Sequence, residues 1–379
     1  MIFCLTQPCI FGIIYIGFVY SVFIFTKLML FEGSNVMKRA MTEIAGNREL
    51  CKRLASDIAS GALSHAYILE GATGSGRKTI ALNVAAATAC ENRFDSTQPL
   101  PCLCCSSCKK ILGKKSTDVI FVRDESKSTV GVDIARFLKE DVRIVPNDIE
   151  DKFYIIENAD KMTTQAQNAL LLTLEEPPSF AHFFLICNND DALLETIRSR
   201  AITLRTQRLS DKEIEDYVCA HDTRAAQMRF TSPNEFKELI KASRGGIGKA
   251  LEYLEPKAFK EIKAQRDFIR SFIFEAISRR RAESIIPMLS KFSSKRDILT
   301  DELLLLALAV RDLIVLKKSD SSSLEFYCEP NEAIELSDKV SLSFLYTLYK
   351  NIDIAIEENK RNANVRIMIM KLAVNSSII

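Results

Sequence analysis

A glycine-rich turn between an apolar segment and a helical segment constrains the fold of this chain more than any other feature. The turn covers residues 71–76, with Gly74 near its middle; it follows a buried strand expected at 66–69 and precedes a helix expected at 78–89. Strand, glycine loop and helix in this order are the setting of a phosphate-binding loop, whose backbone N–H groups surround phosphate oxygens at a helix N-terminus. The sequence therefore predicts an α/β domain built around such a loop.

The two positions that follow the glycines are altered. In the pattern G-x-x-x-x-G-K-[ST] the lysine neutralises phosphates and the hydroxyl binds Mg²⁺. Here Gly71 and Gly76 set the spacing, so Arg77 takes the place of the lysine and Lys78 that of the hydroxyl residue. Using Lys78 and Thr79 as the functional pair would break the glycine spacing. Because Lys78 cannot bind Mg²⁺, we interpret the loop as kept for its shape, with nucleotide binding without hydrolysis as the alternative.

A second ATPase motif is altered in the same direction. The strand expected at 153–156 is followed by Glu157 and Asn158. An active site carries Asp-Glu there, the aspartate organising Mg²⁺ and the glutamate polarising the attacking water. Glu157 can stand in for the aspartate, but the amide of Asn158 cannot act as a general base. The sequence therefore predicts no hydrolysis, although Glu157 could also be an ordinary surface acid at a strand end.

Strands alternate with helices through the first half of the chain, which indicates a parallel sheet covered on both faces. After about Thr206 the strands stop, two or three short helices are expected over 211–254, and the chain is expected to be helical from Pro256 onward. The further elements expected before Thr206 are helices at 42–60, 132–142 and 164–174 and strands at 119–122 and 183–186.

Four of the eleven cysteines have the spacing of a metal site, in a segment expected to be a loop. Cys90, Cys102, Cys105 and Cys108 read C-x₁₁-C-x₂-C-x₂-C, and Cys104 is a spare cysteine among them. Two-residue spacing lets neighbouring thiolates converge on one ion, and four thiolates suit a tetrahedral structural Zn²⁺. An iron–sulfur cluster is the alternative. Such clustering also favours a reducing compartment over a disulfide-bonded secreted protein.

The first 36 residues differ in character from the rest of the chain. Residues 9–26 are almost entirely apolar and long enough to span a bilayer, but the basic leader and cleavage site of a signal peptide are missing. We favour a start codon assigned too early, because Met37 and Met41 stand just before the sequence of an ordinary soluble domain. A membrane anchor and a buried or interfacial helix are the alternatives.

The charge balance argues against extensive contact with nucleic acid. Lys+Arg number 51 against 49 Asp+Glu, a formal net charge of +2. Proteins that bind nucleic acid along a whole face are usually much more basic. Any DNA contact is therefore expected to be local or to belong to a partner, which disfavours a zinc-bearing DNA-binding module.

Together these segments resemble the clamp-loader subunits of bacterial DNA polymerase III. The glycine loop, the four cysteines after its helix and NALLLTLEEPP at 168–178 carry the resemblance, which covers roughly Met41 to the C-terminus and is most specific over 64–205. The segment 196–201 (TIRSRA) is similar to the family's Ser-Arg-Cys motif, with alanine in the last place. The resemblance implies an AAA+ domain over 37–206 with a zinc module at 90–108, a helical lid over 207–255 and a helical collar domain over 256–379.

Departures from the family pattern favour the delta-prime subunit over the gamma/tau motor subunits. Motor subunits keep Gly-Lys-Thr, Asp-Glu and an arginine in the second domain. In this chain Gly248, within 245–251, falls at the place of that arginine, and 362–366 resembles the end of a delta-prime collar. A delta-prime role implies that Arg200 is an arginine finger acting in trans on ATP held by a neighbouring motor subunit. The alternative is that Arg200 is a surface charge at a strand edge.

The resemblance also implies a cellular role. It points to a cytoplasmic DNA replication protein that helps load the sliding clamp on primed DNA together with gamma/tau and delta subunits. Zn²⁺ would be its structural cofactor, with ATP and Mg²⁺ bound at the partner subunits, and a membrane is not expected among its partners. An active gamma/tau-type ATPase and a membrane-anchored AAA+ protein are the alternatives.

Overall fold

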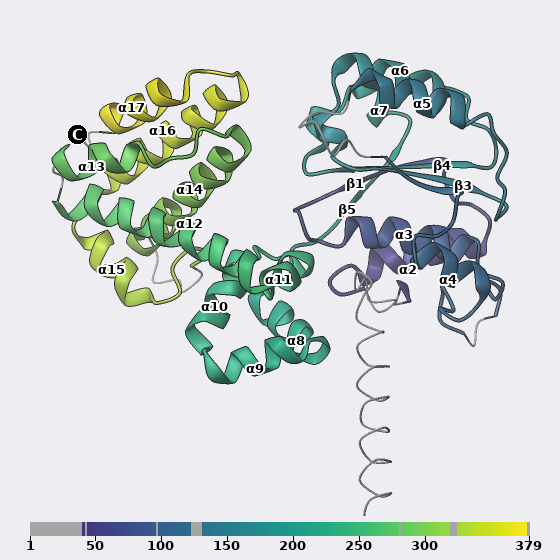
Figure 1. The fold of residues 1–379 in the computed structure, drawn as a ribbon, viewed down its shortest axis with the longest axis horizontal. Coiled ribbons are helices and arrows are strands. Elements are labelled where there is room, and N and C mark those ends of the chain that lie inside the picture. The colour runs from purple at the N-terminus through teal and green to yellow at the C-terminus, as the bar shows by residue number, and fades with distance from the viewer. Residues whose placement is uncertain are drawn as a thin grey trace, which may run out of the picture.

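The computed structural model describes residues 40–41, 44–95, 98–122, 131–279, 282–318 and 324–376. The apolar segment 9–26, and the interpretations attached to it, lie outside these residues. Within the described part of the chain, no helix combines the length and apolar character needed to cross a membrane. Figure 1 shows an α/β domain, a small helical unit and a larger helical C-terminal domain.

A five-stranded parallel sheet in the order β2-β3-β4-β1-β5 forms the centre of the α/β domain. The strands are β1 (Ala66–Glu70), β2 (Val119–Val122), β3 (Lys152–Ile156), β4 (Ala181–Cys187) and β5 (Ile202–Arg205). Strands β3 and β4 are buried along their whole length, as expected where helices cover both faces. The predicted parallel sheet is confirmed, and β5 is a strand that sequence analysis did not name.

Helices cover the two faces of the sheet and create two separate cores (Figure 1). Neighbouring residues of β4 show the division, because side chains alternate along a strand: Phe184 packs in one core and Phe183 in the other. The helices are α2 (Arg48–Ala59), α3 (Arg77–Thr88) and α4 (Ser106–Leu112) on one face, and α5 (Val132–Asp141), α6 (Thr164–Glu175) and α7 (Glu195–Arg198) on the other.

The structure differs from expectation at the start of one helix and in the cysteine segment. The helix expected from residue 42 begins at Arg48, because Gly46 adopts a positive φ of 75° and Asn47 uses its side chain to hold neighbouring segments. The cysteine segment expected to be a loop contains α4, so Cys108 is helical and Cys105 caps the helix. A short helix in a cysteine-rich segment has too few apolar residues to show helical periodicity.

Four short helices follow the sheet and enclose a small core of their own. They are α8 (Asp211–His221), α9 (Thr223–Thr231), α10 (Pro233–Ala242) and α11 (Ile247–Tyr253). Ser210 and Glu213 form a capping box that starts α8, and the single residue Asp222 separates α8 from α9. The expectation of two or three helices was therefore too low.

The C-terminal domain is entirely helical over its described residues and contains the largest core. Its elements are α12 (Pro256–Phe274), a π-helical turn (Glu275–Arg279), α13 (Ala282–Leu289), α14 (Arg296–Lys318), α15 (Pro330–Asp338), α16 (Leu342–Lys360) and α17 (Val365–Asn375). Helix α14 packs against α12, α15 and α16, and so lies at the centre of the domain.

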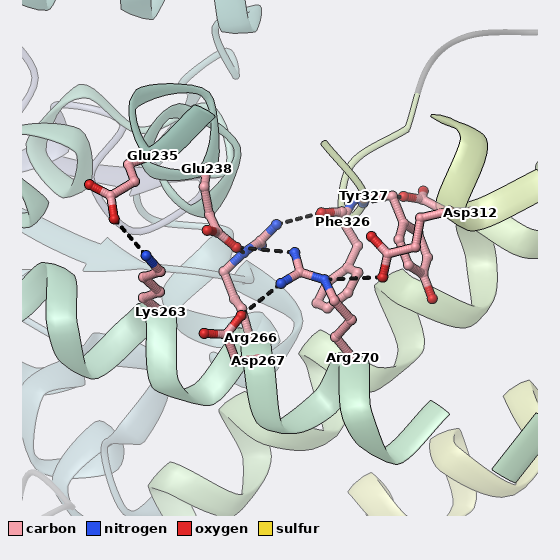
Figure 2. A network of polar contacts seen from close by, with 10 residues as sticks. Glu235, Glu238, Lys263, Arg266, Asp267, Arg270, Asp312, Phe326 and Tyr327 are labelled. Atoms are coloured by element: carbon pink, nitrogen blue, oxygen red, sulfur yellow. Dashed lines mark hydrogen bonds and ion pairs between the residues drawn. The ribbon is translucent and has the colours of Figure 1, made fainter. Parts of the chain in front are cut away.

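A buried polar network joins the small helical unit to the C-terminal domain (Figure 2). Arg266 of α12 is only 1% exposed. Its guanidinium donates to the carbonyl of Phe326 and, at 3.4 Å, to Glu238 of α10. Arg270, one turn further along α12, donates to the same carboxylate at 3.2 Å. One carboxylate of the small helical unit is therefore held by two arginines of the next domain.

The segment that carries Phe326 is also held from the other side. Asp312 of α14 is fully buried and accepts backbone hydrogen bonds from Phe326 at 2.7 Å and Tyr327 at 3.2 Å. Backbone N–H donors of this kind compensate for the burial of a carboxylate. Paired polar groups therefore hold this junction together in addition to apolar packing.

Candidate functional site

A pocket of about 500 Å³ lies where the glycine loop meets the small helical unit. Loop residues 73–79, together with Glu157 and Asn158, line its polar end. A larger hollow of about 650 Å³ lies beside it, but no residue of the glycine loop lines that hollow. The side chains at the apolar end of the pocket are Ile44, Ala45, Ile186, Leu209, Tyr217, Ile247 and Leu251.

The glycine loop is positioned by residues from outside it. Gly71 has a φ of 150°, and a Cβ there would lie 2.0 Å from the hydroxyl oxygen of Thr206, so this position requires glycine. The hydroxyls of Ser75 and Thr206 are 2.7 Å apart, and Asn47 donates to the carbonyl of Ser75 at 3.3 Å. The segments before α2 and after β5 therefore hold the loop in its curved form.

Arg77 turns away from the pocket centre toward the end of β4. Its guanidinium donates to the carbonyl of Cys187 and, at 3.1 Å, to the side-chain oxygen of Asn188. Thr73 of the loop donates to the same oxygen at 3.1 Å. Burial lowers the pKa of Arg77, and the nearby Cys187 and Asp160 oppose that effect. Arg77 therefore acts first as a structural bridge between the glycine loop and β4.

Lys78 and Glu157 form an ion pair inside the pocket. The ammonium of Lys78 contacts Oε1 of Glu157, with the two side chains 37% and 18% exposed. The same ammonium lies 5.0 Å from the ring centroid of Phe121, a cation–π distance. Asn158 follows in a left-handed conformation with φ 53°, and Thr79 lies in the first turn of α3.

This ion pair decides whether the pocket can bind the Mg²⁺ ion that the fold implies. In a working site the loop hydroxyl and the strand-end carboxylate both serve the metal. Here a cation stands at the hydroxyl position and contacts the carboxylate. An ammonium repels a divalent cation and offers it no lone pair. The residues present do not fit a bound Mg²⁺.

The start of α11 touches the glycine loop backbone to backbone. The N–H of Gly248 donates to the carbonyl of Gly74 at 3.1 Å. A Cβ on Gly246 would lie 2.7 Å from the carbonyl oxygen of Thr73, and a Cβ on Gly74 would lie 2.9 Å from the nitrogen of Lys249. Glycines on both sides therefore permit a contact that side chains would prevent.

Arg200 lies just after α7, outside the pocket. Its Nη2 is 2.7 Å from a carboxylate oxygen of Glu175 in α6, and Nη1 donates to the carbonyl of Thr196 at 2.9 Å. The side chain is 36% exposed. Arg200 is thus held in one orientation at the surface by two anchors of its own domain.

The four cysteines of the predicted metal site come together. Their sulfur atoms all lie within 4.8 Å of one another, and those of Cys102 and Cys108 are 4.0 Å apart. Four thiolates at a Zn–S distance of ~2.3 Å would have sulfurs separated by about 3.8 Å. Cys104 is exposed and lies outside this group, with its sulfur 3.5 Å from that of Cys102. The donor set fits a closed metal site.

Backbone groups already point at two of these sulfurs. The N–H of Cys105 lies 3.4 Å from the sulfur of Cys102, and the N–H of Cys108 lies 3.4 Å from that of Cys105. Burial opposes ionisation of Cys102, but the N–H groups of Cys105 and Cys104 and the thiols of Cys104 and Cys90 lower the pKa of Cys102 to about 6. Burial instead raises the pKa of Cys90 and Cys108, so the protein alone favours a thiolate only at Cys102 among these three.

Comparison with known proteins places this geometry in a family. Residues 46–210 match the family model described as DNA polymerase III, delta subunit. The chain is 34% identical over 195 residues to DNA polymerase III subunit delta' of Bacillus subtilis, covering 51% of this chain and 58% of that protein. Over residues 46–210 this chain is therefore similar to the clamp-loader subunits of DNA polymerase III. We call the three parts of this chain the α/β domain, the lid (α8 to α11) and the C-terminal domain.

The relatives include more than one kind of subunit. The chain is 29% identical over 180 residues to the gamma subunit of Buchnera aphidicola, covering 48% of each protein, and 28% identical over 222 residues to the tau subunit of Escherichia coli, covering 56% of this chain and 32% of that one. The chain therefore spans between 32% and 58% of the length of these three relatives.

Two solved structures align along most of the chain at low identity. A gamma-subunit-related protein of Thermotoga maritima covers 86% of this chain and 98% of its own, with 18% identity and a TM-score of 0.44. The clamp loader delta protein of Bacillus subtilis covers 86% and 99%, with 12% identity and a TM-score of 0.32.

Proposed function

We propose that this chain is a delta-prime-like subunit of a DNA polymerase III clamp loader, which helps load the sliding clamp on primed DNA without hydrolysing ATP itself. The ion pair between Lys78 and Glu157 carries the proposal, because it engages the two positions that would hold Mg²⁺. Asn158 supports it, since an amide at the position of the catalytic glutamate cannot activate water.

The proposal predicts that the purified chain turns over no ATP in the presence of Mg²⁺. Phosphate release measured at saturating ATP should equal that of a buffer blank, because both the metal ligands and the general base are altered. A gamma/tau subunit assayed alongside is the positive control. Robust turnover by this chain would replace the proposal with that of an active gamma/tau-type subunit.

Partner subunits would supply the chemistry that this chain lacks. We propose gamma/tau and delta subunits as neighbours, with ATP and Mg²⁺ bound at the motor subunits. An exposed apolar stripe on α17 supports contacts through the C-terminal domain: Ile367, Met370 and Val374 lie on one face of the helix and are open to solvent.

Arg200 would act in trans on ATP bound to a neighbouring motor subunit. Its position outside its own pocket, its exposure and its anchoring by Glu175 and Thr196 support this role. A guanidinium aimed at the developing phosphate charge accelerates hydrolysis.

Arg200→Ala should lower ATP turnover of the assembled loader several-fold in the presence of clamp and primed DNA. The loss is partial because only the adjoining ATP site would lose its finger. Arg198→Ala is the matched control, since Arg198 lies on α7, is similarly exposed and pairs with Asp191 at 3.4 Å. Normal turnover by an assembled Arg200→Ala complex would rule out the finger.

We also propose that the metal held by Cys90, Cys102, Cys105 and Cys108 is Zn²⁺. Four cysteine sulfurs within 4.8 Å of one another suit structural zinc, and a site filled by four protein ligands has no open position for substrate. The ion would therefore stabilise the segment between α3 and β2 and take no part in a reaction.

A further inference from the structure

The ammonium of Lys78 lies at the position where a nucleotide-binding pocket of this kind would hold Mg²⁺. Lys78 places a positive charge where a metal ion would otherwise lie, and Glu157 holds it there. We propose that the Lys78 ammonium replaces the divalent cation, so that the pocket binds a nucleoside di- or triphosphate in its metal-free form. This goes beyond the proposed function, which concerns hydrolysis and partner subunits rather than a ligand of this chain.

The shape and lining of the pocket fit a nucleotide. Its volume of about 500 Å³ lies within the usual range of small-molecule sites. The apolar end, which includes Ile44, Leu209 and Tyr217, offers apolar side chains against which a base can pack. The other end presents the backbone of the glycine loop and the N-terminus of α3, a helix of 12 residues, where phosphate is favoured.

Electrostatics at the phosphate end favour the more highly charged free nucleotide. Lys78 and Glu157 bring one positive and one negative charge to the pocket wall, and the buried guanidinium of Arg77 adds a positive charge toward the end of β4. The ammonium of Lys114 also lies 5.6 Å from the ring centroid of Phe121, on which Lys78 packs. A metal-bound nucleotide would carry less negative charge into this site and would bring its cation toward Lys78.

Lys78 can contact Glu157 and a phosphate at the same time. An ammonium has three donors, and the bond to Glu157 uses one of them. The other two remain for phosphate oxygens, while the carboxylate and the Phe121 ring restrain the otherwise flexible side chain. The ion pair therefore orients the cation rather than neutralising the site.

Calorimetric titration of the full chain with ADP and with ATP, in EDTA and in millimolar MgCl₂, tests the inference. The wild-type chain should bind in EDTA, and Mg²⁺ should leave the affinity unchanged or weaken it. Absence of binding in both buffers would overturn the inference, and so would binding that requires Mg²⁺. The ATPase tests of the assembled loader do not depend on this result.

Two substitutions separate the role of Lys78 from that of the loop backbone. Lys78→Thr should weaken binding in EDTA by about 10-fold or more, the effect of losing one hydrogen bond to a charged group, and should make binding sensitive to Mg²⁺. Glu157→Gln should strengthen binding in EDTA, because it removes a negative charge from the pocket wall while its side-chain oxygen can still accept from Lys78. The control is Lys52→Thr on α2, an exposed lysine paired with Glu49. Unchanged affinity in both pocket variants would overturn the role of Lys78.

Discussion

Cys108→Ser is expected to abolish zinc binding and to unfold the segment between α3 and β2. Cys108 is fully buried in α4 and lies 4.0 Å, sulfur to sulfur, from Cys102. The cluster around it contains little apolar material besides the cysteines and Leu100. Structural zinc contributes about 10 kcal/mol or more to the folding of small zinc modules at neutral pH, so its loss should unfold the segment even though Ile111 and Leu112 of α4 pack in the neighbouring core.

Metal analysis and limited proteolysis would measure both effects. We expect about one equivalent of zinc in the wild-type chain, none in Cys108→Ser, and new cleavage confined to the cysteine segment. Cys104→Ser is the matched control, because Cys104 lies outside the four-sulfur group and is exposed. Zinc retained in Cys108→Ser, or lost in Cys104→Ser, would show that the ligands are assigned wrongly. Iron with visible absorption would favour the iron–sulfur alternative.

The sequence predicts the strands of the α/β domain that are apolar runs, and it misses β5. Strands β1 to β4 are continuous apolar runs because both faces of the sheet are covered, and such runs are visible in a sequence. Strand β5 lies at the sheet edge, and only Leu204 of its four residues is buried. Its pairing with β1, which no local pattern encodes, makes it a strand.

The candidate pocket could be predicted as a set of residues but not as a set of contacts. The glycine spacing identifies Arg77 and Lys78, and the strand end identifies Glu157. That Lys78 pairs with Glu157 and Arg77 with β4 depends on the order of strands in the sheet. Asn188 was not predicted as a site residue, although it lies in a polar run directly after the buried strand β4, and ligand sites form at this edge of a parallel sheet.

The polar contacts between the lid and the C-terminal domain could not be predicted from sequence patterns either. Arg266 lies in an amphipathic helix, where an arginine normally faces solvent. Its partners Glu238 and Phe326 are 28 and 60 residues away along the chain. Neither periodicity nor composition indicates that these groups meet in a buried network.

Arg266→Met should destabilise the lid and C-terminal domain by about 3 kcal/mol, near the lower end of the cost of breaking a buried ion pair. The substitution leaves the carbonyl of Phe326 without its guanidinium donor and removes a cation–π contact of 4.7 Å. Glu238 keeps Arg270 as a partner at 3.2 Å, which limits the loss. Chemical unfolding would give the size of the effect, and hydrogen exchange would locate it.

Lys263→Met on the same helix is the control. Lys263 pairs with Glu235 at 2.6 Å, but both side chains are substantially exposed, so its removal should cost less than about 1 kcal/mol. Equal losses in the free energy of unfolding for the two substitutions would mean that burial of the Arg266 ion pair adds nothing to its contribution to stability. A large effect of Arg266→Met alone, with lid and C-terminal amides losing protection together, would mean that these two parts move as one body. Rearrangement within an assembled loader would then fall on the short connection between β5 and α8, near the backbone contact of Gly248 with Gly74.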